Sequence, residues 1–306
     1  MIIPGGRNSN YRTTSIDKMF SLNCDAMHGA RILLLGRVAL FLSFLKSAAD
    51  LEEDVILGIT RKLGWLFDVL IDVEVYSSVL ALQVPILNGS SETPELAYEP
   101  MFSNILHALK TFMIVVYSSP AWGEIESFLL ENFLHPHFLC WEIVMELWCF
   151  MVRHTEINMV TDIIDKLCLL LRFVASSNSV LVPGSALRKI ARSSCMILSC
   201  SPQHMVDRAY GSIVGSSGSK LSSVMFVALL MEGFQLNLLS DKMRSVVEQR
   251  IVMEYFEFVE SFNDESLRVC NSDAFGAPVF AMSAVSQSLE LLHCMNWKLQ
   301  FAKVKV

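Results

Sequence analysis

Three histidines and two glutamates in the middle of the chain could bind a metal ion or move protons. His135 and His137 flank a proline and His154 lies further along the same segment, whereas zinc-binding helical pairs have i, i+4 spacing and a full ligand set. Glu142 and Glu146 are one helical turn apart, a spacing that acid–base chemistry could use. They are also the only acids on a strongly apolar helix. The pattern therefore favours structural or solvated side chains, and we predict no metal site.

A second group combines thiols, hydroxyls and an imidazole. Cys195 and Cys200 lie near His204 and the serine pair Ser193 and Ser194. The motif GxSxG is absent, and the spacing specifies no cysteine–histidine pair. We expect no nucleophilic catalysis here.

The segment 211–220, GSIVGSSGSK, has the glycine and lysine content of a phosphate-binding loop. It lacks the register GxxxxGK[ST], leucine follows the lysine, and no buried strand precedes it. We predict a flexible loop between helices. Together with the two groups above, this indicates a protein that is not an enzyme and has no catalytic residues, metal or other cofactor.

Helices must position these residues, and the clearest helix covers residues 137–154. At about 100° per residue, Glu142, Glu146 and Arg153 fall within one narrow stripe, and nearly all other positions are apolar. A helix that is hydrophobic almost all round is a buried helix. We therefore predict a core element in which Trp141 and Trp148 pack inside.

Composition raises the question of a membrane protein, because 53% of the 306 residues are hydrophobic, 18% are charged and the mean hydropathy is +0.45. Each long apolar run is interrupted. The best candidate span, 221–239, contains Glu232, two serines and a glycine, whereas a spanning helix needs about 20 predominantly apolar residues. We predict no membrane insertion.

Charge and cysteine content narrow the function further. The net charge is −7 and there is no long basic run, which argues against strong direct nucleic-acid binding. The best small basic cluster, Arg188, Lys189 and Arg192, is expected to be a solvated helix face. The eight cysteines form no CxxC pair, and the N-terminus has no apolar signal region, so we expect an intracellular, reducing location.

The chain is predicted to be all-α. Helical patterns cover 31–48 and 51–82, and from residue 101 helices alternate with short turns roughly every 40 residues, as in HEAT or armadillo arrays. We predict stacked helical hairpins, an α-solenoid. Three prolines in 85–100 indicate a linker without regular structure. The predicted parts are a disordered N-terminus (1–15), an N-terminal helical block (16–84), a Pro/Ser-rich linker (85–100) and a helical-hairpin array (101–306).

Capping residues predict where several helices of the array begin. Ser119 is a plausible N-cap with Pro120 at the first helical position, and Thr155 can cap the next amphipathic helix. Asp241 is expected to open a helix that carries Val247 and Ile251.

Residues 117–164 carry a family resemblance. It rests on Ser119-Pro120, on ESFLLENFLHPHF at 126–138, on ELWCFMVRHTEINMV at 146–160 and on the residues 162–164. This region resembles the centre of the fidgetin-like-1-interacting protein family, which includes a plant protein and an animal regulator of recombination and mitosis. The family-motif residues that we predict as structural core are Trp141, Trp148, Cys149, Phe150 and Arg153.

The resemblance implies a non-enzymatic adaptor that partners a fidgetin-like AAA ATPase. Through that ATPase, family members act on strand-exchange recombinase filaments, limit meiotic crossovers and support homologous-recombination DNA repair. This implies a nuclear, chromosome-associated location, with a cytoplasmic location as the alternative. Family members are longer, so this chain is expected to be a partial member. An alternative is a generic HEAT-like protein-interaction scaffold with another client.

Overall fold

The computed structural model describes residues 30–88, 95–176, 182, 184–214, 220–261, 278–279 and 281–283. Most of this part of the chain is helical, and it contains twelve α-helices and two short strands. The prediction of an all-α fold of consecutive packed helices, of the helical-repeat kind, is confirmed. The chain divides into two compact units, residues 1–150 and 151–306, which are described separately below.

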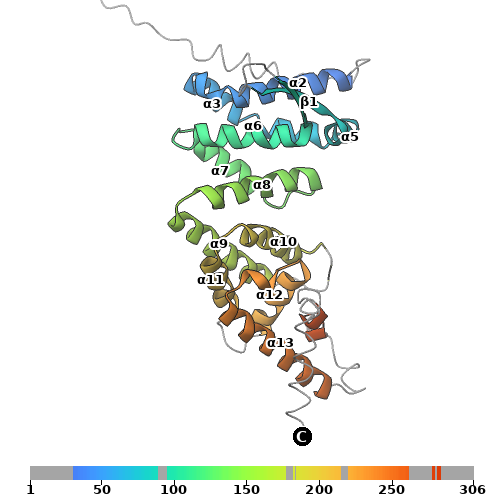
Figure 1. Ribbon diagram of the computed structural model, residues 1–306, viewed down its shortest axis with the longest axis vertical. Coiled ribbons are helices and arrows are strands. Elements are labelled where there is room, and N and C mark those ends of the chain that lie inside the picture. The colour runs from blue at the N-terminus through green and yellow to red at the C-terminus, as the bar shows by residue number, and fades with distance from the viewer. Residues whose placement is uncertain are drawn as a thin grey trace, which may run out of the picture. The chain divides into compact units, whose positions relative to one another are not determined.

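The first unit is built on the long helices α2 and α6 (Figure 1). Helix α2 packs against α5 and α6, and α7 packs against α3 and α6. Large side chains such as Phe41, Leu45, Ile105 and Phe112 are fully buried between them. The helices are α2 (Ala30–Lys46), α3 (Glu53–Thr60), α4 (Leu63–Leu70), α5 (Val73–Ala81), α6 (Met101–Val116), α7 (Trp122–Glu131) and α8 (Phe138–His154), which runs past residue 150.

The predicted helix over 51–82 is three helices, α3 to α5. One reason is local: the Asp72 side chain accepts a hydrogen bond from the Val75 backbone N–H over 3.1 Å, which caps α5 and separates it from α4. Aspartate competes with the helical backbone in this way and therefore favours helix starts over helix interiors.

A β-hairpin replaces the predicted unstructured linker, which was wrong for residues 85–88 and 95–100. Strands β1 (Gln83–Asn88) and β2 (Glu95–Pro100) pair antiparallel, with Pro85 opposite Tyr98. Met101 N donates to Leu82 O over 2.9 Å, so Leu82 and Met101 form a hydrogen-bonded pair. From this pair outward along the hairpin, hydrogen-bonded and non-hydrogen-bonded pairs alternate. Pro85 thus falls in a non-hydrogen-bonded pair, where its missing N–H costs no ladder bond.

The second unit packs around α9 (Ile157–Ala175). This helix contacts α10 (Ala186–Ser199), α11 (Gln203–Val214) and α12 (Lys220–Met231), and α12 also contacts α10 and α11. The helix α13 (Asp241–Ser261) follows. The amphipathic pattern of residues 157–174 predicts an apolar stripe on α9. Val160, Ile164, Leu167, Leu171 and Val174 of that stripe are buried, whereas Ile157 in the first turn is 47% exposed.

The predicted caps were partly wrong. Helix α7 begins at Trp122 with Ala121 as N-cap, and the Ser119 hydroxyl accepts a hydrogen bond from Ala121 N over 3.2 Å, just ahead of the helix. Glu156 is the N-cap of α9, and the Thr155 hydroxyl is buried without a hydrogen-bond partner in the described structure. The predicted start of α13 at Asp241 is confirmed, with Val247 and Ile251 buried.

The apolar run 221–239 contributes buried residues to the core of the second unit. Helix α12 ends at Met231, and residues 225–230 are all buried within the second unit. None of the helices in the described ranges is long and apolar enough to span a membrane.

Candidate protein-interaction site

The histidines proposed from sequence as possible ligands form local packing contacts. His135 Nδ1 accepts a hydrogen bond from His137 N over 3.1 Å, which shapes the turn before α8. The two rings make edge contacts with Phe67 and Tyr76, at centroid distances of 5.6 and 5.2 Å. His154 is exposed at the end of α8. Within the described ranges, no three His, Cys, Asp or Glu side chains are grouped so as to hold a metal ion.

The two glutamates of α8 have structural surroundings. Glu146 Oε2 accepts from Lys110 Nζ over 2.9 Å, an ion pair that joins α6 to α8. The same ammonium lies 6.0 Å from the ring centroid of Phe150. Glu142 is half-buried. The ion pair stabilises the packing of α6 against α8. The carboxylates of Glu142 and Glu146 do not form a shared acid–base site.

The Cys–Ser–His group is dispersed over α10 and α11. Cys195 is buried, its thiol donates to Leu229 O over 3.5 Å, and burial raises the pKa of the thiol far above its usual range. Cys200 is half-exposed and accepts from Arg153 Nη2 over 3.0 Å, while His204 is exposed. Ser193 and Ser194 are buried. A thiol held protonated in this way is a poor nucleophile.

The segment 211–220 is only partly a loop. Residues 211–214 form the last turn of α11 and Lys220 begins α12, so the prediction of a loop over the whole segment was wrong at both ends. Residues 215–219 lie outside the described part of the chain.

The basic cluster of α10 contributes to a structural ion pair rather than to a solvated face alone. Arg188 and Arg192 both bond to Glu232, whose side chain is 4% exposed. Lys189 is exposed.

The five family-motif residues divide by burial. Trp148 and Cys149 are buried, Trp141 and Phe150 are half-buried, and Arg153 is exposed. The prediction that all five belong to a core was therefore wrong for Arg153, because the last turn of α8 carries its charge into solvent.

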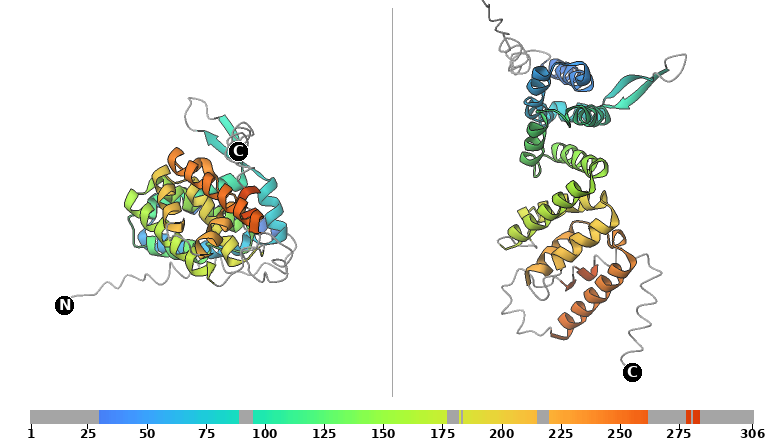
Figure 2. Two further views of the ribbon diagram at one scale, coloured as in Figure 1. Left: turned by 90° about the horizontal axis from the view of Figure 1, so that it is seen from below. Right: turned by 90° about the vertical axis from the view of Figure 1, so that its left-hand side faces the viewer.

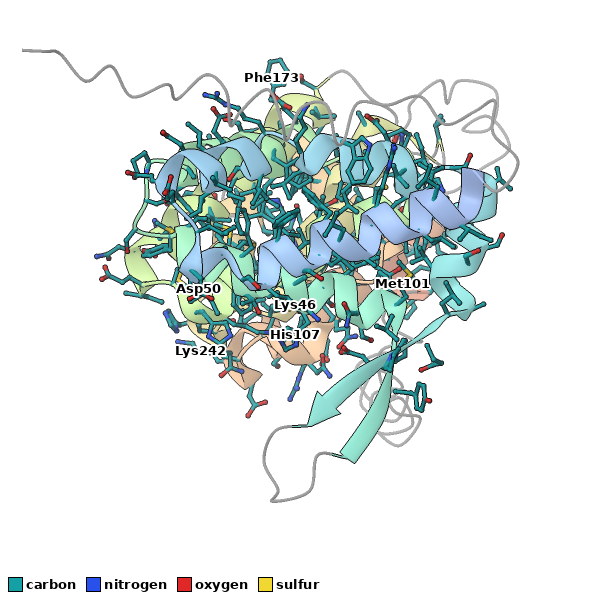
Figure 3. The ribbon with its side chains drawn as sticks, turned by 90° about the horizontal axis from the view of Figure 1, so that it is seen from above. Lys46, Asp50, Met101, His107, Phe173 and Lys242 are labelled. Atoms are coloured by element: carbon teal, nitrogen blue, oxygen red, sulfur yellow. The ribbon has the colours of Figure 1, made fainter. Side chains whose placement is uncertain are left out.

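A solvent-facing apolar group on α9 is the best candidate for a binding site, and it was missed from sequence. Phe173 is 76% exposed, Leu169 is 60% exposed and Leu170 is 38% exposed. Figure 3 shows Phe173 projecting outward from its helix. These three residues, which we call the α9 patch, lie on the side of the helix that also carries the ion pair Asp162–Lys166. An exposed apolar cluster bordered by charge is typical of a protein-binding surface.

The signal for the α9 patch was present in the sequence. At about 100° per residue, Leu169 and Phe173 fall near Asp162 and Lys166 and opposite the apolar stripe that the period predicts as core. An amphipathic helix with large apolar residues on its polar side has two apolar faces, and only one of them is needed for the core.

The fold and this surface define an all-α, helical-repeat protein with a candidate surface for binding another protein. A family model described as a domain of unknown function (DUF4487) matches residues 12–304, and the chain belongs to that family. No curated protein and no solved structure matches the chain.

Proposed function

We propose that the chain is a non-enzymatic helical adaptor that binds a fidgetin-like AAA ATPase through the α9 patch. In this role it regulates strand-exchange recombinase filaments in the nucleus, limits meiotic crossovers and supports homologous-recombination repair. The observation that carries the proposal of a binding role is the exposure of Phe173. The choice of partner rests on the resemblance of residues 117–164 to the fidgetin-like-1-interacting proteins.

The α9 patch would gain free energy from being covered by a partner, because its apolar side chains now face water. Burying a phenylalanine side chain contributes about 1.5 to 3 kcal/mol relative to leaving it in water, and two neighbouring leucines add to that. Aromatic residues at the centre of an interface often dominate its binding energy. Phe173 is an aromatic residue of this kind, and the exposed leucines Leu169 and Leu170 lie beside it in the patch. The exposed ion pair Asp162–Lys166 can form part of a polar rim around them.

Charge supports action through protein partners. The chain has a net charge of −7, so few of its basic side chains can contact DNA phosphates without repulsion from nearby acids. In the best basic cluster, Arg188 and Arg192 are already bonded to Glu232. We expect the chain to bind duplex DNA weakly, with a shallow dependence on salt.

The direct test uses the full chain and a purified fidgetin-like ATPase. We expect the two proteins to co-purify, and the double substitution Leu169→Asp with Phe173→Asp to reduce binding by at least about a hundredfold, since it removes apolar contacts and adds charge at the centre of the patch. The matched control is Ile114→Asp on α6, because Ile114 is 65% exposed and lies outside the patch. We expect this control to bind like the wild type.

A cellular readout addresses the pathway. Loss of the gene product should raise the number of recombinase foci or of crossovers, and the patch variant should reproduce this effect. Normal foci and crossovers in a complete knockout, with no ATPase binding by the wild-type chain, would contradict the proposal and would favour a scaffold with another client.

A further inference from the structure

The outer edge of β2 presents backbone groups that the hairpin does not use. By alternation from the Met101–Leu82 bond, Leu96 and Tyr98 stand in non-hydrogen-bonded pairs, so their N–H and C=O groups point away from β1. In the described part of the chain, no backbone group outside the hairpin hydrogen-bonds to these groups. Figure 2 shows the hairpin reaching away from the helices of the first unit. Such an edge is a template for another strand.

The outer edge of β1 is less suitable. Gln83, Pro85 and Leu87 are the residues whose backbone groups point outward there, by the same alternation. Pro85 has no N–H, so this edge lacks a donor at its centre. Proline on an edge strand blocks pairing with other chains. A further strand can therefore pair more readily with the outer edge of β2 than with the outer edge of β1.

Charge decides between a second copy and a different partner. Glu95 and Glu99 flank Ala97 at two residues on either side, so the three positions share one face of β2. If two copies paired through β2 in the antiparallel register that uses both Leu96 and Tyr98, each Glu95 would stand opposite the second copy's Glu99. Like charges directly opposite each other are destabilising in a sheet. Self-pairing is therefore disfavoured, and a basic strand is favoured.

We propose that the outer edge of β2 is a binding site for an extended, basic strand of a partner protein, added antiparallel by β-augmentation. The register requires Lys or Arg at two positions four residues apart, opposite Glu95 and Glu99. The two positions opposite Leu96 and Tyr98 suit β-branched residues, which pack well on a pleated surface. This site lies in the first unit and does not depend on the ATPase binding proposed for α9.

The test uses two fluorescein-labelled hairpin peptides that are cyclised by a disulfide, because preorganisation lowers the entropic cost of binding. Their outer strands read Lys-Val-Thr-Val-Lys and Glu-Val-Thr-Val-Glu. We expect the lysine peptide to bind the full chain in fluorescence anisotropy and the glutamate peptide to bind at least about tenfold more weakly. Glu95→Lys should narrow or reverse this preference.

Two substitutions at one position separate backbone pairing from charge attraction. Tyr98→Pro removes one outward N–H but no ladder bond, and we expect about a tenfold loss of affinity for the lysine peptide. Tyr98→Val keeps the N–H and is expected to bind within about twofold of the wild type. Tyr98 is 64% exposed, so neither change should disturb the core.

Amide exchange provides a residue-level readout. In protein labelled with ¹⁵N-leucine and ¹⁵N-tyrosine, the lysine peptide should slow exchange of the Leu96 and Tyr98 amides by at least about tenfold. Three results would overturn the proposal: no binding of the lysine peptide, equal binding by Tyr98→Pro, or a dimer in sedimentation that Tyr98→Pro dissociates. The last would assign the edge to a second copy.

Discussion

Arg192 Nε lies 2.7 Å from Glu232 Oε2, and this bond ties α10 to the residue that follows α12. The other carboxylate oxygen of Glu232 accepts from Arg188, so one nearly buried acid joins two bases that are one helical turn apart. The Arg188 side chain is itself only 13% exposed. A buried charge is tolerated when it is paired and hydrogen-bonded, and strongly destabilising when it loses its partner.

Removing the charge of Glu232 should therefore weaken the second unit. We expect Glu232→Gln to lower the free energy of unfolding by about 2 to 3 kcal/mol, because Arg188 and Arg192 would both lose the carboxylate charge that they contact. We expect a smaller loss of stability than for a fully buried ion pair, because Arg192 is 56% exposed. Urea unfolding followed by circular dichroism measures it. The control is Glu124→Gln, which breaks the exposed pair with Arg61 and should cost less than about 1 kcal/mol. Equal effects would contradict the assignment.

Trp148 should be one of the most sensitive positions of α8. Its indole is 7% exposed and meets the Phe133 ring edge to face, with centroids 6.0 Å apart. Trp148→Ala should cost about 3 to 5 kcal/mol because it leaves a cavity. Trp148→Phe should cost less than about 2 kcal/mol, since the indole N–H is buried with no partner in the described structure and an aromatic ring is retained. Trp141→Ala, at a half-buried position, should cost less than Trp148→Ala.

An unchanged melting temperature in Trp148→Ala would place this side chain at the surface and would contradict the burial described here. Differential scanning calorimetry of the three tryptophan variants gives the comparison in one series.

The sequence predicted those features that follow from a helical period and missed those that depend on which neighbours are present. Burial of Val144 and Trp148 follows from an apolar circumference, and both are buried. The bond from Arg188 to Glu232 joins residues that are distant in sequence, and no local pattern predicts it.

The hairpin was missed for a different reason. The three prolines in 85–100 predict a linker. A proline is nevertheless tolerated in a strand where its missing N–H would face outward, and only the register that pairs Pro85 with Tyr98 reveals that position. The α9 patch could have been found, because Leu169 and Phe173 were visible on the polar face.

The buried cysteines should make stability fall at high pH. Burial raises the pKa of the Cys140 thiol to about 12 and that of the Cys168 thiol to about 11. In the unfolded chain these thiols ionise near pH 8.5, roughly the value for a free cysteine. The native state therefore holds protons that the unfolded state has lost, and the contribution is fully present below about pH 8.5 and is lost as the pH rises toward 11 or 12.

Substitution of a single thiol tests this linkage. Between pH 8 and pH 10.5, the stability of the wild type relative to Cys168→Ala should fall by about 2 to 2.5 kcal/mol, because pH 10.5 lies about two units above the unfolded-state pKa and each unit is worth about 1.4 kcal/mol. Other groups that titrate in this range are common to both proteins and cancel in the difference. Urea unfolding at the two pH values measures it, and a difference that stays constant would contradict the raised pKa.

Alkylation should separate the same cysteines by burial. Cys140, Cys149, Cys168 and Cys195 are buried, whereas Cys200 is half-exposed at the end of α10. Among these five cysteines, we expect iodoacetamide at pH 8 to modify Cys200 in the native protein and the four buried thiols only after unfolding in urea, because the thiolate is the reactive form and burial suppresses it. Peptide mass spectrometry identifies the modified residues. In the matched variant Cys200→Ser, none of the remaining four cysteines should be alkylated in the native protein. Rapid modification of Cys195 in the native protein would show that α10 separates readily from α12.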